Sequence, residues 1–294
     1  RVCPPKTKFS AAPEEEIMAS IIKAITKYLP DKRVLDEQQR FDDFAKPLFH
    51  KGNEIGCITL HGIGGTPANI RAVADPLINC GYTVYAPMLP GHGETVRALN
   101  GSTGEQWLAC VLEAYDRLKA EGCTQILAFG LSLGGILAGL LAERRELKGL
   151  MMICAPVKTQ AYLRVARAIS PILPFVRYPR DEDEENSWRK NPYAQMYDGF
   201  STLKLKDLGR LTRHLKKDLD KIACPVFVLQ ARYDDKVDPA SVEILRKGLT
   251  AAAPLDFLML DNSPHGCTYG PERELVGTLA ADFAARVVDK PAGA

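Results

Sequence analysis

A serine between glycines in the middle of the chain is the residue best placed to do chemistry. Ser132 is the centre of the G-x-S-x-G sequence at 130–134. An apolar run at 125–129 precedes it, and a second at 135–143 follows it. Strand, sharp turn and helix form the setting in which such a serine projects its hydroxyl, and the glycines permit the turn. The spacing predicts a nucleophile at Ser132, beside a helix N-terminus that favours negative charge.

A serine nucleophile needs a base, and the chain offers five histidines. Only His265 lies in a polar loop after a late apolar strand pattern, at 255–260. His214 belongs to a basic helical stretch and His50 to a polar segment ahead of the first core strand. We therefore predict that His265 is the general base, with His92 as the alternative.

The acid that orients the histidine should lie just after the core strand that comes before the histidine's own strand in the chain. The apolar run 225–230 reads as that strand, and Asp234, Asp235 and Asp238 follow it. Asp238 precedes a proline and is better explained as the cap of the next helix. Asp234 comes first after the strand, so we predict it as the orienting carboxylate and keep Asp235 as the alternative.

A glycine-rich loop at 61–67 follows another strand pattern, at 54–60. Such a loop can aim a backbone N–H at a developing oxyanion, as can the residue after the nucleophile. We predict the amides of Ile63 and Leu133 as the two donors. Phosphate binding is the rival interpretation, but the loop lacks both G-x-G-x-x-G and a Walker lysine. His61 is interpreted as a residue that braces the loop.

Six segments together resemble the α/β-hydrolase superfamily, and within it small bacterial carboxylesterases and monoacylglycerol lipases. The resemblance covers roughly Ile55 to Val288, and the segments that carry it are 61–67, 81–87, 89–93, 130–135, 230–234 and 263–265. It implies an α/β fold with a mostly parallel central sheet flanked by helices and a helical cap insertion. It also implies the roles already predicted for Ser132, His265 and Asp234, and for the Ile63 and Leu133 amides.

Two positions depart from the pattern of those relatives. Ile63 stands where an aromatic residue is common, which keeps the backbone amide but changes the wall of the acyl pocket. Pro264 stands before the histidine where glycine is usual, and its fixed φ angle is expected to stiffen the loop.

The resemblance implies a serine carboxylester hydrolase that acts on short- to medium-chain acyl esters or monoacylglycerols through an acyl-enzyme. A feruloyl or aryl esterase, a thioesterase or an amidase would use the same triad, and acyl transfer to an alcohol is a further variant. An alternative of another class is a non-catalytic receptor or scaffold on a hydrolase fold. The expected partner is therefore a small-molecule ester.

The predicted domain organisation has three parts. Residues 1–50 form an N-terminal arm and an amphipathic helix, 51–156 and 218–294 form the hydrolase core, and 157–217 form the cap insertion. No core strand is recognisable within 157–217. Apolar residues of this segment are expected to line an acyl tunnel, or else to form the cap's own small core; they are Ile169, Leu173, Phe175, Val176 and Tyr193.

The predicted N-terminal helix covers 14–29 and carries one apolar face, formed by Ile17, Ile21 and Ile25. We expect this face to pack on the body of the protein, with a lipid surface or a second subunit as the alternatives. The sequence does not indicate the oligomeric state.

Composition narrows the function classes. Lys and Arg number 38 and Asp and Glu 36, with no basic stripe, which argues against a nucleic-acid partner. The eight cysteines are scattered without metal-ligand spacing, so no metal or cofactor is expected. Isolated cysteines within apolar runs favour a reducing compartment such as the cytoplasm. The chain begins at Arg1, so a removed signal or anchor stays an alternative.

Overall fold

A mostly parallel sheet forms the centre of the molecule, which we describe from a computed structural model covering residues 35–36, 41–177 and 191–288. Its seven strands follow the order β1-β3-β2-β4-β5-β8-β9. Only β1 pairs antiparallel, and this confirms the predicted fold class. The strands are β1 (Leu48–His50), β2 (Ile55–Leu60), β3 (Thr83–Ala86), β4 (Gln125–Leu131), β5 (Gly149–Ile153), β8 (Val226–Tyr233) and β9 (Leu255–Pro264).

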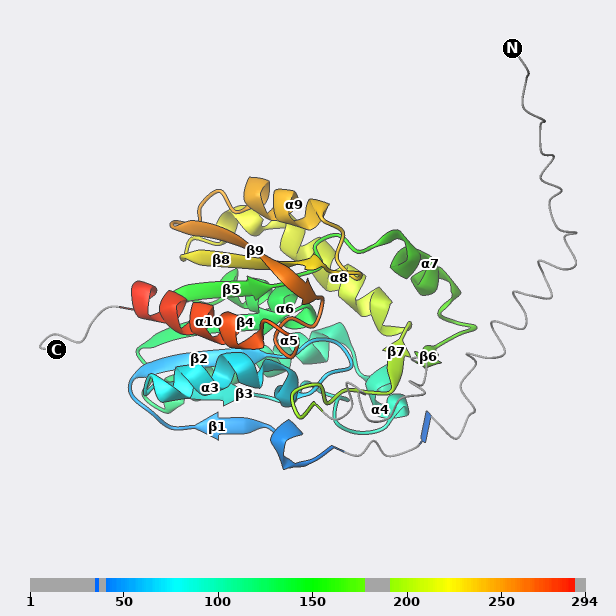
Figure 1. Cartoon of the computed structure of the whole chain (residues 1–294), viewed down its shortest axis with the longest axis horizontal. Helices are drawn as coiled ribbons and strands as arrows, with labels where there is room; N and C mark the ends of the chain where they lie inside the picture. The colour runs from blue at the N-terminus through cyan, green and yellow to red at the C-terminus, as the bar shows by residue number, and fades with distance from the viewer. Residues whose placement is uncertain (1–34, 37–40, 178–190, 289–294) are drawn as a thin grey trace, which may run out of the picture.

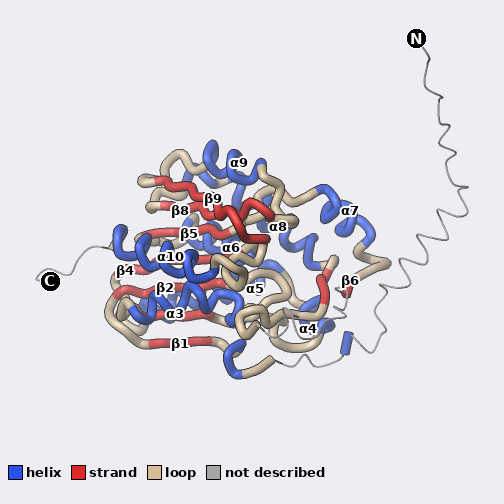
Figure 2. The backbone as a smooth tube through the Cα atoms, in the orientation of Figure 1, coloured by secondary structure: helices blue, strands red, loops and turns tan. Residues whose placement is uncertain are grey.

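Helices cover both faces of this sheet (Figures 1 and 2). One face carries α3 (Arg71–Asn79) and α10 (Arg273–Val287), and the other carries α5 (Gly104–Ala120), α6 (Leu133–Ala142) and α9 (Ala240–Gly248). A short helix, α4 (Val96–Gly101), precedes α5. Because β4 in the middle of the sheet is buried on both faces, its side chains contribute to two separate cores, and this explains its uninterrupted apolar run.

The segment between β5 and β8 contains α7 (Ala161–Ile169), β6 (Phe175–Arg177), β7 (Gly199–Ser201) and α8 (Lys204–Lys217). The two strands pair antiparallel and form a small sheet of their own, apart from the central one. The insertion is therefore not purely helical as predicted, because three-residue strands are too short to show a periodic pattern. Its predicted bounds, 157–217, remain a prediction.

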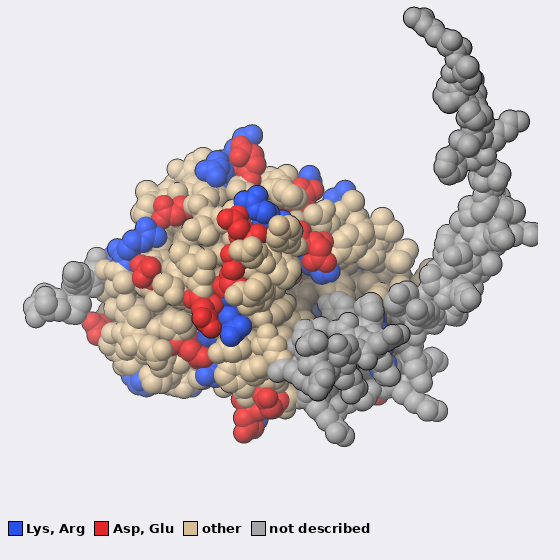
Figure 3. All heavy atoms as spheres, viewed as in Figure 1, with Lys and Arg blue, Asp and Glu red and all other residues tan. Residues whose placement is uncertain are grey.

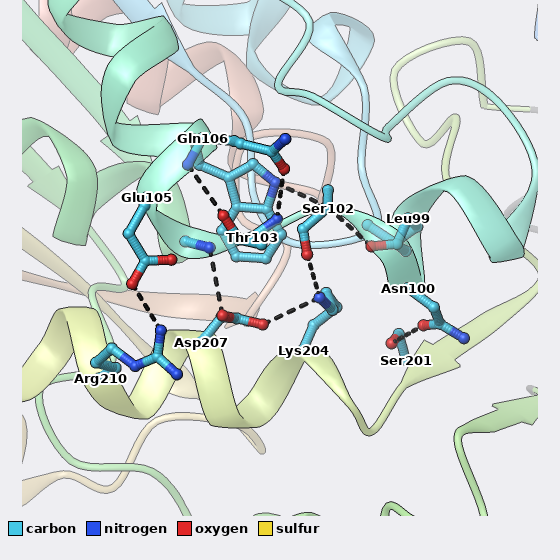
Figure 4. A network of polar contacts seen from close by, with 12 residues as sticks. Leu99, Asn100, Ser102, Thr103, Glu105, Gln106, Ser201, Lys204, Asp207 and Arg210 are labelled. Carbon is cyan, nitrogen blue, oxygen red and sulfur yellow. Dashed lines mark hydrogen bonds and ion pairs between the residues drawn. The ribbon is translucent and has the colours of Figure 1, made fainter.

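Helix α8 joins this insertion to the body of the protein. It packs along α6, where a Cβ atom on Gly139 would lie 2.8 Å from Cδ1 of Leu215. At its start, Lys204 and Asp207 point toward the beginning of α5 (Figure 4). Lys204 donates to the carbonyl of Ser102, and its Nζ lies 3.0 Å from Oδ2 of Asp207. Asp207 in turn accepts from the N–H of Gly104. This polar network docks the insertion on the core.

Replacing Lys204 with methionine is expected to destabilise the protein by about 3 kcal/mol, because it leaves a carboxylate without its buried countercharge. The side chains of Lys204 and Asp207 are only 5% and 13% exposed. Urea unfolding measures the change in free energy. The double variant Lys204→Met/Asp207→Leu is the control and should recover part of the loss. A single-variant loss below about 0.5 kcal/mol, typical of a surface site, would contradict the expectation.

Charges on the surface are mixed. On the face drawn in Figure 3, acidic and basic side chains lie interspersed. None of the helices in the described ranges is long and apolar enough to cross a membrane. The predicted amphipathic helix at 14–29 lies outside the described residues.

Candidate active site

The carboxyl ends of four parallel strands of the central sheet bring the predicted residues together. The loop with Ile63 follows β2, Ser132 follows β4, Asp234 follows β8 and His265 follows β9. Parallel strands end at the same edge of a sheet, which is where ligands bind in open α/β folds. The sheet order thus gathers residues that are far apart in the chain.

Ser132 occupies the sharp turn between β4 and α6, as the glycine spacing predicts. Its φ angle is 55°, a left-handed conformation that a serine rarely adopts. The turn depends on its glycines, since a Cβ atom on Gly130 would lie 2.1 Å from the carbonyl oxygen of Gly134. A Cβ atom on Gly134 would lie 2.3 Å from the carbonyl oxygen of Leu60. The strained backbone presents the hydroxyl at the edge of the sheet.

Two hydrogen bonds connect Ser132, His265 and Asp234. Nε2 of His265 lies 2.9 Å from Oγ of Ser132, and Nδ1 lies 2.8 Å from Oδ2 of Asp234. A carboxylate can only accept, so Nδ1 carries the proton and Nε2 is free to accept the proton of the serine hydroxyl. His265 is 17% exposed and Asp234 2%, so the acid is shielded while the base reaches the surface of the site. This is the geometry of a serine–histidine–aspartate triad, in which the carboxylate orients the histidine and the histidine contacts the serine hydroxyl.

The carboxylate of Asp234 is fully used as an acceptor. Oδ1 accepts from the N–H groups of Lys236 and Val237, at 2.8 and 2.9 Å. Oδ2 accepts from His265 and also from Nε2 of Gln230, at 2.9 Å. Burial raises the pKa of Asp234, but the hydrogen bonds from His265 and the two backbone amides outweigh burial, and the pKa is lowered. Asp234 is therefore ionised near neutral pH.

The two other candidate carboxylates have different partners. Oδ2 of Asp235 lies 2.7 Å from Nζ of Lys236. Oδ1 of Asp238 accepts from the N–H of Ala240, the first residue of α9, although the N-cap position itself is Pro239, one residue later than predicted. Neither carboxylate has a hydrogen bond to the histidine.

His92, the alternative base, lies buried behind the glycine-rich loop. Its ring packs against those of His61 and Trp107, with centroids 4.9 and 5.6 Å away. Burial lowers the pKa of His92 well below its ordinary value, so the ring is neutral. The hydroxyl of Ser132 is bonded to His265 instead.

The glycine-rich loop runs directly beside the nucleophile. A Cβ atom on Gly62 would lie 3.3 Å from Cβ of Ser132, so the loop approaches as closely as glycine allows. Leu133 is the first residue of α6, where the N–H has no partner in the helix itself. The amides of Ile63 and Leu133 remain the predicted oxyanion donors.

His61 holds this loop from behind. Nδ1 lies 2.9 Å from the carbonyl oxygen of Gly62, and Nε2 accepts from the N–H of Leu89 at 3.1 Å. Burial lowers the pKa of His61 to about 4, against the opposing effect of the Gly62 bond, so the ring is neutral and Nδ1 donates. The Gly62 carbonyl and the Ile63 N–H belong to one peptide plane. His61 therefore sets the direction of the Ile63 N–H.

If the Ile63 amide is an oxyanion donor as predicted, replacing His61 with leucine should lower kcat by about 10- to 100-fold, because that amide loses its support. It should also destabilise the fold by about 1–3 kcal/mol, since the Leu89 N–H and the Gly62 carbonyl stay buried without this partner. Steady-state kinetics and chemical denaturation, measured on the same preparation, separate the two effects. A kcat within twofold of the wild type would mean that His61 does not position the amide.

A cavity of about 470 Å³ opens in front of Ser132 and His265. Its wall is mainly apolar and contains Leu163 of α7 together with Leu205 and Leu208 of α8. Other apolar residues of the wall come from the core and from the insertion, and they include Leu131, Pro156, Met196 and Phe200. Polar groups at the wall include Asn69, Thr159, Asp235 and Lys236. The cavity suits an apolar chain attached to a small polar group.

The five insertion residues predicted to line a tunnel do not belong to this wall, and here the structure corrects the sequence analysis. Ile169 is 40% exposed, whereas Leu173 and Phe175 are buried. Val176 and Tyr193 are half-buried, and the Tyr193 ring packs on that of Phe44. Other residues of the insertion contribute to the wall instead, among them Leu163, Met196, Phe200, Leu205 and Leu208. Apolar composition predicts burial but not which neighbour a side chain meets.

One group of potential metal ligands occurs in the described part of the chain. Atoms of Cys154, Asp234 and His265 lie within 4.8 Å of one another. Two of these residues already bond to each other, and Cys154 is fully buried with its Sγ 3.8 Å from Sγ of Cys267. Asp234 and His265 are thus engaged in the hydrogen bonds that lead to Ser132, and Cys154 contacts the thiol of Cys267.

The chain is similar to several known proteins. A family model described as the alpha/beta hydrolase family matches residues 57–278. The thermostable monoacylglycerol lipase of Bacillus sp. (strain H-257) is 30% identical over 254 residues, which cover 86% of this chain and 99% of that protein. The carboxylesterase of Bacillus subtilis (strain 168) is 29% identical over 238 residues, or 81% and 95% of the two chains.

A solved structure from work on LipS and LipT, two metagenome-derived lipolytic enzymes, is similar in fold. It superposes with a TM-score of 0.75 at 25% identity. The match covers 84% of this chain and all of the other.

Proposed function

The chain belongs to the alpha/beta hydrolase family, and we propose that it is a serine-dependent carboxylic ester hydrolase. The observation that carries the proposal is the pair of bonds from Ser132 through His265 to Asp234 at the wall of an apolar cavity. Two relatives that cover most of the chain, named a monoacylglycerol lipase and a carboxylesterase, support hydrolysis of carboxylic esters.

The proposed reaction proceeds through an acyl-enzyme. Ser132 attacks the ester carbonyl while His265 takes the hydroxyl proton at Nε2. Asp234 holds the imidazole in the Nδ1–H form and stabilises the imidazolium. The amides of Ile63 and Leu133 bind the tetrahedral oxyanion. His265 then protonates the leaving alcohol, and water repeats the two steps on the acyl-enzyme.

The proposed substrates are short- to medium-chain acyl esters or monoacylglycerols. The apolar wall offers burial for an acyl chain, and the polar residues beside it offer hydrogen bonds for an alcohol group. Residues 157–217 are proposed to act as a cap, a role supported by Leu163, Leu205 and Leu208 on the cavity wall. An aryl ester, a thioester or an amide would engage the same triad.

Hydrolysis of p-nitrophenyl esters from acetate to palmitate tests the proposal, with wild type and Ser132→Ala measured in parallel. We expect activity that peaks at a short or medium chain and disappears in the variant. Wild-type activity on thioesters or amides alone would move the proposal to those classes. No turnover and no labelling by an organophosphonate would favour the non-catalytic scaffold.

A further inference from the structure

Gln230 contacts the same oxygen of Asp234 that receives the histidine. Its Nε2 lies 2.9 Å from Oδ2 of Asp234, and Nδ1 of His265 lies 2.8 Å from that oxygen. Gln230 begins the segment 230–234, one of those that resemble the α/β-hydrolase superfamily. The signal available in the sequence is a polar residue inside the strongly apolar strand pattern that leads to Asp234.

A glutamine at this position requires a partner. Gln230 is 5% exposed and lies on β8, a strand with neighbours on both sides. Burying a carboxamide is unfavourable unless it forms hydrogen bonds. Because a carboxylate only accepts, the atom that faces Oδ2 must be the amide nitrogen, and the side chain is oriented by the acid.

The four bonds to Asp234 divide into two pairs. The backbone amides of Lys236 and Val237 hold Oδ1, whereas the side chains of Gln230 and His265 share Oδ2. Without Gln230 the second oxygen would have one hydrogen-bond partner, the imidazole, whose charge changes during the proposed reaction. Gln230 supplies a neutral donor whose charge stays the same throughout the reaction. Its hydrogen bond stabilises part of the negative charge on Oδ2, which would otherwise interact with His265 alone.

We propose that Gln230 is a positioning residue for the proposed triad. It fixes Oδ2 in line with Nδ1 of His265 and limits how strongly the carboxylate favours the imidazolium form. Gln230 does not belong to the cavity wall, so it acts through Asp234 and not on the substrate. This inference rests on the proposed function for its kinetic readout, but the bond between Asp234 and His265 can be observed without substrate.

Gln230→Met removes the donor and keeps an unbranched side chain of similar volume. We expect kcat to fall about tenfold with KM within twofold, since a hydrogen bond to a charged group is lost away from the substrate. We also expect the acidic limb of the pH profile to move to higher pH. Without the hydrogen bond from Gln230, the Asp234 carboxylate stabilises the imidazolium form of His265 more strongly. A purely structural role would lower activity equally at every pH and leave the limb in place.

Gln230→Glu is the second variant. A protonated carboxyl at 230 can still donate to Oδ2, whereas an ionised one places a like charge beside Asp234. Activity should therefore be closest to wild type at low pH and fall as the added carboxyl ionises. Thr59→Val is the matched control, because Thr59 is buried on β2 and its Oγ1 has no hydrogen-bond partner among the described residues. The control should keep the wild-type pH profile.

Proton NMR of the free enzyme distinguishes failure of this inference from failure of the proposed function. The Nδ1 proton of His265 should give a downfield signal in the wild type, and in Gln230→Met it should shift and exchange faster with water. That change supports the positioning role even if none of the esters is hydrolysed. An unchanged signal together with an unmoved acidic limb in Gln230→Met would overturn it.

Discussion

Ser132→Ala is expected to reduce ester turnover by on the order of 10⁵-fold or more, with little change in stability. Oγ of Ser132 is the atom that would attack the carbonyl. Alanine has no hydroxyl, so the variant lacks both this nucleophile and the proton that His265 would accept. The backbone at 132 has a φ angle of 55°, and alanine has the same Cβ atom as serine there. The turn, and the binding of substrate in the cavity, should therefore persist.

The measurement is kcat/KM on the best p-nitrophenyl ester, with thermal unfolding of the same samples. Ser170→Ala is the matched control, since it removes a buried hydroxyl that donates to the Arg167 carbonyl, far from the triad in the chain. The control should retain activity close to wild type. Turnover by Ser132→Ala within tenfold of the wild type would require another nucleophile.

Asp234→Asn is expected to lower kcat by on the order of 10⁴-fold, because the amide can present an N–H group to Nδ1 and favour the wrong tautomer of His265. Asp235→Asn should stay within about tenfold of wild type, since its carboxylate pairs with the adjacent Lys236 and not with His265. The two variants are nearly identical in composition, so a direct comparison of kcat isolates the position of the acid. A larger loss at Asp235 would reverse the assignment.

The pH dependence provides a second check on Asp234. Its pKa is lowered below 3.8, so the carboxylate contributes stability above that value and loses it only as the pH falls through the lowered pKa. Titration of Asp234 should therefore leave activity between about pH 5 and 9 unaffected. Any acidic limb of the profile above pH 5 should therefore belong to a group other than Asp234. An additional inflection near pH 5 in the wild type, absent in Asp234→Asn, would contradict this account.

Short-range features of the sequence predicted much of this site. Glycines around Ser132 define a turn whose geometry depends on atoms within a few residues, so the G-x-S-x-G spacing and its apolar flanks were sufficient. The order of strand patterns placed Asp234 and His265 at the ends of successive strands, and parallel pairing brings such ends to one edge. The two short strands of the insertion were missed because three residues are too few to establish a period.

The bonds of the site depend on residues separated by 31 and 133 positions, and no local pattern specifies such distances. The sequence favoured Asp234 over Asp235 by its place after the strand, but the contact with His265 is visible only in the folded chain. There the carboxylate of Asp234 is held by Lys236, Val237 and Gln230.

The cavity wall was likewise decided by tertiary packing. The sequence identified apolar residues within the insertion, but it could not tell which of them face Ser132 and which pack elsewhere. The hydrophobic effect depends on the apolar area removed from water and hardly on which apolar neighbour covers it. Composition therefore predicts that these side chains are buried, but not against what. Their partners depend on how α7 and α8 dock on the core, which is fixed by long-range contacts such as that of Lys204 with Ser102.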